Sequence, residues 1–338
     1  MDTLEGPVLV VAGAGTGKTR VIEYRVLRLV DRGVSPHKIL LLTFTRKAAR
    51  EMLARTCGHN ECCARVEGGT FHSFAYKVIR RYYHKLGMKE NFSFIDDADA
   101  AQAVGMLIDK CGAKRSPGRF PRKDTLQAIF SAAFNHQETF ASLLAKNYPQ
   151  FSQAVAQIEK INREYQEYKF ERGLIDYNDM LFYLRVLLDD DEIKEAMRRR
   201  YAYVMVDEFQ DTNKIQADIA CALGAMSGNI LVVGDDTQSI YSFRGAHYRN
   251  MFDFPRRFPG TKIIKLEENY RSTQPILDLA NAIIAEEREK YTKALYAVRR
   301  GKDKPRLNYF QDAHSEALWV VENIRQMQAQ GVARDKIG

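Results

Sequence analysis

A glycine-rich loop between a strand pattern and a helix pattern constrains the fold of this 338-residue chain more than any other feature. The apolar run Val8–Ala12 predicts a buried strand, and apolar residues at helical spacing after Lys18 predict a helix. Between them lies AGAGTGKT, residues 12–19. A glycine-rich turn that ends in Gly-Lys-Thr, between a strand and a helix, is typical of a phosphate-binding loop. The segment therefore predicts an α/β fold with a nucleotide site.

Further apolar runs extend this pattern into a sheet. Strands are expected at 39–42, 203–206, 230–233 and 262–266, with helices between them. Alternating strands and helices favour a parallel sheet with right-handed crossovers. From about 83 to 184 the apolar runs disappear, and helical periodicity indicates an inserted helical domain.

The loop supplies groups that suit a magnesium-bound triphosphate. Its backbone amides can approach phosphate oxygens because glycine has no side chain, and the helix start adds the positive end of its dipole. Lys18 places a charge near the β- and γ-phosphates, and the Thr19 hydroxyl can ligate Mg²⁺. The predicted nucleotide contacts of this loop are Gly13, Ala14, Gly15, Thr16, Gly17, Lys18 and Thr19.

Two acidic residues follow the predicted strand at 203–206. Because Asp207 and Glu208 end this strand, both carboxylates are expected at the sheet edge beside the loop. Asp207 is predicted to hold Mg²⁺, and Glu208 to orient and deprotonate an attacking water. Two acids after a strand could also be a surface cap, but their combination with Lys18 and Thr19 favours the catalytic hypothesis.

Six motifs occur in order along the chain: AGAGTGKTR (12–20), LLTFTRKAAREM (41–52), GTFHSFAY (69–76), VMVDEFQDTN (204–213), VVGDDTQSIYSFRGA (232–246) and LEENYRST (266–273). Together they resemble the UvrD/Rep-like DNA helicases of superfamily I, the 3′-to-5′ branch. The resemblance implies a RecA-like P-loop NTPase domain at 1–82 plus 185–270, with the helical domain inserted at 83–184. Residues 271–338 would begin a second RecA-like domain. The implied cofactors are ATP and Mg²⁺, and the implied partners are single-stranded DNA and junctions with duplex.

The resemblance also assigns roles to single residues of these motifs. Gln238 would contact the γ-phosphate, and Arg271 would stabilise charge that builds in the transition state. Tyr270 and Arg20 would stack on the two faces of adenine, which by itself selects no base. The implied single-stranded DNA contacts are Phe44, Thr70, His72, Tyr241, Phe243 and Arg244.

Structural roles compete with several of these assignments. Phe44 and Phe243 could be core residues, because apolar aromatic side chains are often buried. His72 could simply be a polar residue at the start of a helix. The acidic segment 176–179 could cap a helix, and the basic loop 114–123 could be a solvated hinge rather than a contact to duplex DNA.

Charge and composition restrict the partners only weakly. Lys and Arg total 51 against 43 Asp and Glu, and the formal net charge of +8 is compatible with a polyanionic partner. No export signal or membrane-length apolar run is apparent, so the cytoplasm is the expected compartment and a membrane is not an expected partner. Three cysteines lie within 57–63, but zinc sites draw ligands from two separated segments, which favours an ordinary reduced loop.

The resemblance stops early at both ends of the chain. The family's glutamine that reads the adenine edge would precede Met1, and its later motifs, one with a second catalytic arginine, would follow Gly338. We therefore expect a monomeric N-terminal fragment that binds Mg-ATP and single-stranded DNA, hydrolyses ATP poorly and unwinds nothing. The motor subunit of a helicase–nuclease and an ATP-switched DNA-binding module remain alternatives.

Overall fold

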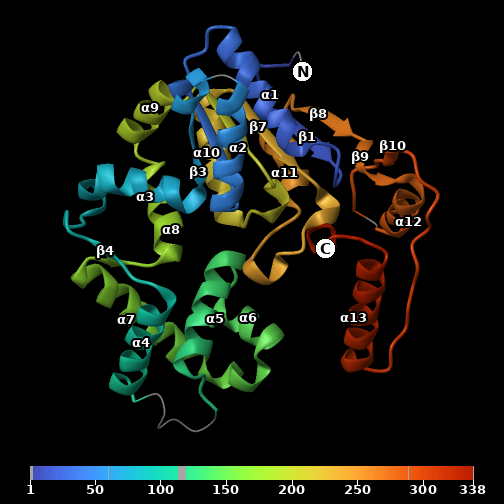
Figure 1. The fold of residues 1–338 in the computed structure, drawn as a ribbon. Coiled ribbons are helices and arrows are strands. Elements are labelled where there is room, and N and C mark those ends of the chain that lie inside the picture. Colours follow the sequence, from blue (N-terminus) through green and yellow to red (C-terminus); the bar gives the residue numbers. More distant parts are fainter. Residues whose placement is uncertain (1–2, 60, 113–118, 288, 338) are drawn as a thin grey trace.

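A six-stranded sheet forms the centre of the structure (Figure 1), a computed structural model that describes residues 3–59, 61–112, 119–287 and 289–337. The strand order is β3-β2-β6-β7-β1-β8, and every neighbouring pair is parallel. The strands are β1 (Val8–Ala12), β2 (Ile39–Thr43), β3 (Glu67–Thr70), β6 (Tyr203–Val206), β7 (Ile230–Gly234) and β8 (Lys262–Leu266). Their carboxyl ends therefore meet at one edge, where open α/β sheets bind ligands.

Helices cover both faces of this sheet, as expected because its central strands β1, β2, β6 and β7 consist largely of buried apolar residues. One face is covered by α1 (Lys18–Asp31) and α2 (Arg46–His59). The opposite face is covered by α3 (Phe71–Tyr82), α8 (Tyr177–Leu187), α9 (Asp191–Arg200), α10 (Lys214–Ser227) and α11 (Asn250–Arg257). Successive side chains of a strand point to opposite faces. Val10 of β1 therefore packs in the core under α1 and α2, whereas its neighbour Leu9 packs in the core on the opposite face.

A helical layer with its own hydrophobic core lies between α3 and α8 in sequence and below the sheet in Figure 1. Its helices are α4 (Asp97–Lys110), α5 (Lys123–His136), α6 (Phe140–Asn147) and α7 (Val155–Arg172). The short parallel strands β4 (Ser93–Phe94) and β5 (Leu174–Ile175) pair where the chain enters and leaves this layer. Leu181 and Leu184 of α8 belong instead to a core of the sheet. The predicted insert boundary at 184 thus falls within α8, and the division into domains stays a prediction.

The chain beyond β8 forms a smaller unit beside the sheet. β9 (Glu268–Thr273) pairs in parallel with β10 (Tyr296–Arg299). α12 (Gln274–Ala285) starts with a proline in its first turn, where the missing N–H leaves no hydrogen bond unmade. α13 (Ala313–Ala329) stands apart from the other helices in Figure 1 and has no buried residue. In the part of the chain that the structure describes, no helix is both long and apolar enough to cross a bilayer.

The edge strand β3 was missing from the sequence prediction. Its residues Glu67–Thr70 include two adjacent glycines, which have low strand propensity, and no apolar run. Tertiary packing explains the strand, because a Cβ at Gly68 would lie 3.0 Å from Leu53 and one at Gly69 would lie 2.4 Å from the Ser73 hydroxyl. The close approach of α2 and α3 therefore leaves little room for a side chain at either position.

Candidate nucleotide site and aromatic groove

The predicted phosphate loop connects β1 to α1 at the carboxyl edge of the sheet. Gly15 and Gly17 have φ angles of 76° and 89°, which strain any residue other than glycine. The Thr16 hydroxyl donates to the Gly13 carbonyl at 2.8 Å and holds the loop in shape. Gly17 is the N-cap of α1, and no side chain caps the helix, so its first amides remain able to bind an anion.

A cavity of 420 Å³ opens beside this loop, and we call it the nucleotide cavity. Its lining combines the loop with side chains that follow β6, β7 and β8 in the sequence. The lining residues are Ala14, Gly15, Gly17, Lys18, Thr19, Arg20, Arg55, Glu208, Gln238, Tyr270 and Arg271. The structure therefore brings most of the predicted nucleotide contacts together, whereas Gly13, Thr16 and Asp207 do not belong to this lining.

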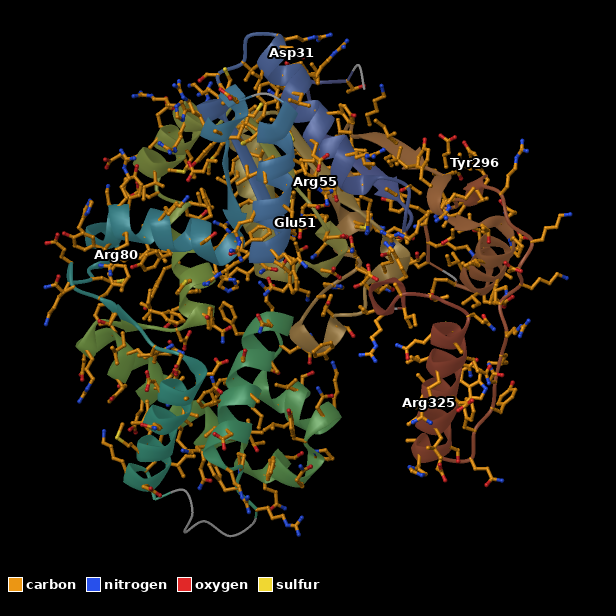
Figure 2. The ribbon with its side chains drawn as sticks, viewed as in Figure 1. Asp31, Glu51, Arg55, Arg80, Tyr296 and Arg325 are labelled. Atoms are coloured by element: carbon orange, nitrogen blue, oxygen red, sulfur yellow. The ribbon has the colours of Figure 1, made fainter. Side chains whose placement is uncertain are left out.

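Arg55 is a cavity residue that the sequence analysis missed. It lies on α2 one turn after Glu51 (Figure 2), and its guanidinium is 3.5 Å from a carboxylate oxygen of the buried Glu23 on α1. A single arginine on a predicted helix resembles any solvated surface residue, so only the packing of α1 against α2 reveals it. Arg55 adds a positive charge to the wall of the nucleotide cavity.

The two acids after β6 have different environments. The Glu208 carboxylate accepts from the Lys18 ammonium at 2.9 Å, and Glu208 adopts a left-handed backbone conformation with φ 49°. Asp207 is only 5% exposed, and one of its carboxylate oxygens accepts from the Glu208 amide at 3.0 Å. Burial, followed by the charge of Glu208, raises the pKa of Asp207 to about 7.

These groups fit a magnesium ion that is bound together with a nucleotide. The neighbouring charge of Glu208 helps to raise the pKa of Asp207, and a divalent cation would stabilise both carboxylates in their charged form. Such cations prefer oxygen ligands. Within the described ranges, no group of three or more His, Cys, Asp or Glu could hold a metal ion. A cation at Asp207 and Thr19 would therefore take its other ligands from phosphate and water, as Mg²⁺ does. The same finding gives no support to zinc at Cys57, Cys62 and Cys63, although the His59 side chain lies outside the described part.

An asparagine attaches β9 to the phosphate loop. Asn269 is 1% exposed, and its amide nitrogen donates to the Ala14 carbonyl at 2.5 Å. Its side-chain oxygen accepts from the backbone amides of Arg271 at 2.9 Å and Ser272 at 2.7 Å. The Tyr270 amide also donates to the Gly15 carbonyl at 3.0 Å. These bonds hold Tyr270 and Arg271 at the nucleotide cavity.

A buried ion-pair cluster supports Gln238. The Gln238 amide donates to Asp235, which also pairs with Lys293. Lys293 lies 2.7 Å from Asp236, and the side chains of Lys293, Asp235 and Asp236 are almost completely buried. Burial alone would raise the pKa of Asp235, but Lys293 holds it below its ordinary value. Lys293 was not predicted from the sequence, because a lysine in the loop between α12 and β10 resembles a solvated residue.

A second cavity of 490 Å³, which we call the aromatic groove, lies between the sheet edge and α5. Its aromatic walls are Phe44, His72, Tyr177 and Phe243, and its polar residues include Asn135, Asp211, Asn213 and Gln216. Ring centroids of Phe44 and Tyr241 are 5.3 Å apart, those of Tyr241 and Phe243 are 6.0 Å apart, and those of His72 and Tyr177 are 5.5 Å apart. The structure thus brings Phe44, His72 and Phe243 into the lining of one groove together with Tyr177, while Tyr241 packs against Phe44 and Phe243.

Exposure and hydrogen bonds decide some of the structural alternatives. Phe243 is 73% exposed, so the core interpretation is wrong for it, and Phe44 is half-buried. Thr70 is buried and caps α3 by accepting from the Ser73 amide. His72 is the second residue of α3, so it does lie at the start of a helix, and burial lowers its pKa to about 4, so the imidazole is neutral at pH 7.

Two further alternatives concern the segments that flank the helical layer. Asp176 and Asp179 form a capping box at the start of α8, which confirms the capping interpretation. The Arg244 side chain and residues 113–118 of the basic loop lie outside the described part of the chain. Tyr177 directly follows the capping residue Asp176, and its position in the sequence gave no sign that it would line the aromatic groove.

Comparisons with known proteins agree with this geometry. Residues 1–259 match the model for the UvrD/REP helicase N-terminal domain, and residues 264–337 match that for the UvrD-like helicase C-terminal domain. The chain belongs to the UvrD/REP helicase family. Its parallel sheet and these matches confirm the predicted RecA-like fold of this family member.

Several curated relatives of this UvrD/REP family chain are named ATP-dependent DNA helicase PcrA. The protein from Staphylococcus epidermidis is 35% identical over 333 residues, which are 97% of this chain and 45% of the relative. The one from Leuconostoc citreum is 35% identical over 334 residues, 97% of this chain and 43% of the relative. The one from Bacillus subtilis is 32% identical over 343 residues, 98% of this chain and 44% of the relative. The chain thus spans less than half the length of these relatives.

Proposed function

We propose that this chain binds Mg-ATP in the nucleotide cavity and single-stranded DNA in the aromatic groove, as the ATP-hydrolysing part of a 3′-to-5′ DNA helicase. One observation carries the proposal. Residues from distant parts of the sequence meet in a single cavity that combines the Lys18 ammonium group, the Glu208 carboxylate and guanidinium groups, as expected around a metal-bound triphosphate.

Each side chain of the nucleotide cavity has a role in this proposal. Phosphate oxygens would replace the Glu208 carboxylate as the partner of Lys18, because both compete for one ammonium group. Glu208 would then be able to orient and deprotonate a water. Thr19 and Asp207 would hold Mg²⁺, which supplies positive charge against the phosphates.

The remaining residues of the cavity would recognise the rest of the nucleotide. Gln238 and Arg271 would contact the terminal phosphate, where charge develops during hydrolysis. Tyr270, which is 52% exposed, and the exposed Arg20 lie at the rim of the cavity. Their side chains are available to stack on a base, which favours any nucleoside triphosphate over a free phosphate.

The aromatic groove suits single-stranded rather than double-stranded DNA. Phe44, Tyr177 and Phe243 offer ring faces on which unpaired bases can stack, whereas the bases of a duplex are already stacked on one another. His72 is neutral, so it would contribute packing rather than attraction to phosphate. Tyr241 extends the row of aromatic rings beyond Phe243, while Thr70 and Arg244 remain proposed contacts.

DNA binding is tested by fluorescence anisotropy with a labelled oligothymidine. We expect Phe243→Ala to weaken binding by about 5- to 150-fold, the equivalent of about 1–3 kcal/mol for one stacked base. Phe170→Ala is the matched control, because Phe170 is also an exposed phenylalanine but lies outside the aromatic groove. Equal affinities of both variants and the unaltered chain would refute the groove assignment. An RNA oligonucleotide of equal length tests whether DNA is the preferred strand.

Phosphate release separates a motor from an ATP-controlled switch. In any longer form of the protein that contains the later family motifs, stimulation of steady-state ATP hydrolysis by an oligonucleotide supports the motor, and its absence supports the switch. For the 338-residue chain we expect Mg-ATP binding with little turnover, since hydrolysis in this proposal also needs the second catalytic arginine that the family resemblance places in a later motif. Rapid DNA-stimulated turnover by the chain alone would contradict this part of the proposal.

A further inference from the structure

One buried glutamine lies between the nucleotide cavity and the aromatic groove. Gln210 belongs to the short 3-10 helix Phe209–Asp211 that follows β6, and it is 1% exposed. Its side-chain nitrogen donates to the Glu208 carboxylate at 2.8 Å and to the Asp211 carboxylate at 3.3 Å. Glu208 lines the nucleotide cavity, and Asp211 lines the groove. A single amide therefore contacts one acid of each cavity.

The oxygen of the same amide contacts the segment after β7 that carries Gln238. It accepts from the Asp235 backbone amide at 3.0 Å, at the end of β7. Asp235 in turn accepts from the Gln238 side chain. The position of the Gln210 amide is thus linked to Glu208 on one side and to the support of Gln238 on the other.

Asp211 has a free acceptor position. One of its carboxylate oxygens accepts from Gln210, while the other is buried and has no hydrogen-bond partner among the described residues. A buried acceptor without a partner is unfavourable, so a donor that enters the groove gains by engaging Asp211. Such a contact would move Asp211 relative to the Gln210 side-chain amide, which donates to both Asp211 and Glu208.

We propose that Gln210 is a positioning residue that couples the groove to the nucleotide cavity by sharing its amide between Asp211 and Glu208. A ligand that occupies the groove hydrogen-bonds Asp211 and thereby weakens or shifts the bond between Asp211 and the Gln210 amide. This changes how firmly the amide holds Glu208 and the Asp235 backbone that supports Gln238. Nucleotide binding acts in the reverse direction, because coupling between two binding sites is reciprocal. This inference rests on the proposed function, which supplies the two ligands.

The test measures coupling rather than affinity alone. Binding of a labelled oligothymidine is titrated with and without saturating Mg-ATPγS, and the ratio of the two dissociation constants gives the coupling. We expect a ratio that differs from one by about fivefold or more in the unaltered chain. In Gln210→Met, which keeps the length of the side chain but no amide, each ligand still binds and the ratio moves close to one.

Two further variants separate positioning from general damage. Ser239→Ala is the control, because the Ser239 hydroxyl donates to the Gln210 backbone carbonyl at 3.2 Å and not to its side chain. It should keep the coupling. Asp211→Asn gives a second test should Gln210→Met fail to fold, and it should also lose the coupling because its amide would compete with that of Gln210.

The outcomes distinguish this inference from the proposed function. If the unaltered chain binds neither ligand, both fall together. If it binds both ligands without coupling, or if every folded Gln210 and Asp211 variant keeps the coupling, this inference alone is overturned. Equal loss of coupling in Ser239→Ala would also overturn it, since the effect would then come from the loop rather than from the shared amide.

Discussion

Replacing Asn269 with alanine should weaken nucleotide binding although Asn269 does not line the nucleotide cavity. Its side chain makes three hydrogen bonds, to the Ala14 carbonyl and to the backbone amides of Arg271 and Ser272. With 1% exposure, little water can replace these contacts. Alanine would therefore release the strand that carries Arg271 from the phosphate loop.

The magnitude follows from the number of bonds that are lost. Each hydrogen bond contributes about 1 kcal/mol net, so Asn269→Ala should cost about 3 kcal/mol in all. Part of this cost lowers the free energy of unfolding of the chain. The other part lowers the affinity for the nucleotide, because binding must then also order the loosened strand beside the cavity. If half is expressed in binding, the dissociation constant for Mg-ATP rises about tenfold, since about 1.4 kcal/mol corresponds to a factor of ten.

Isothermal titration calorimetry with Mg-ATPγS, together with urea unfolding, tests this prediction. Asn229→Ala is the matched control, because the Asn229 side chain also hydrogen-bonds backbone groups, the Gly6 amide and the Ala202 carbonyl, and neither residue belongs to the phosphate loop. It should lower the free energy of unfolding and leave the affinity nearly unchanged. If both variants changed the affinity equally, or if Asn269→Ala bound like the unaltered chain, the argument for a connection between strand and loop would be refuted.

Three further predictions concern buried charges and the metal. Folding lowers the pKa of His72 from 6.5 to about 4, so between these pH values the unfolded chain binds more protons than the folded chain. The free energy of unfolding should therefore drop by up to about 1.4 kcal/mol per pH unit as the pH falls from 6.5 to 4, and His72→Gln should lack this slope in urea titrations. Lys293→Met leaves two buried carboxylates without their cation and should cost about 3–5 kcal/mol by the same assay. EDTA should weaken ATP binding in calorimetry, and Asp207→Asn should bind ATP weakly with or without Mg²⁺.

Local sequence signals were sufficient where the local pattern and the tertiary environment agree. β1, β6 and β7 were predicted because they are continuous apolar runs, and such runs form the buried strands of parallel sheets. Turn chemistry located the phosphate loop, since glycines at positive φ precede a helix start. β3 was missed because its conformation depends on packing against α2 and α3 rather than on its own residues.

The same distinction applies to the residues of the site. Lys18 and Glu208 could be predicted because their motifs are short and contiguous, although their contact spans 190 positions of the sequence. Asn269, Lys293 and Gln210 could not, because their importance lies in partners that only the folded chain brings near. A polar residue acquires such a role through burial beside specific acceptors, and sequence spacing does not encode this burial.

The claim that the nucleotide cavity holds Mg-ATP is tested most directly by calorimetry of Mg-ATPγS binding to the unaltered chain and to Lys18→Met. Lys47→Met is the matched control, because the Lys47 side chain is 85% exposed and lies away from the cavity lining. We predict one bound nucleotide per chain for the unaltered protein and for Lys47→Met, and no measurable binding for Lys18→Met with an unchanged circular dichroism spectrum. Equal binding by all three proteins would contradict the account.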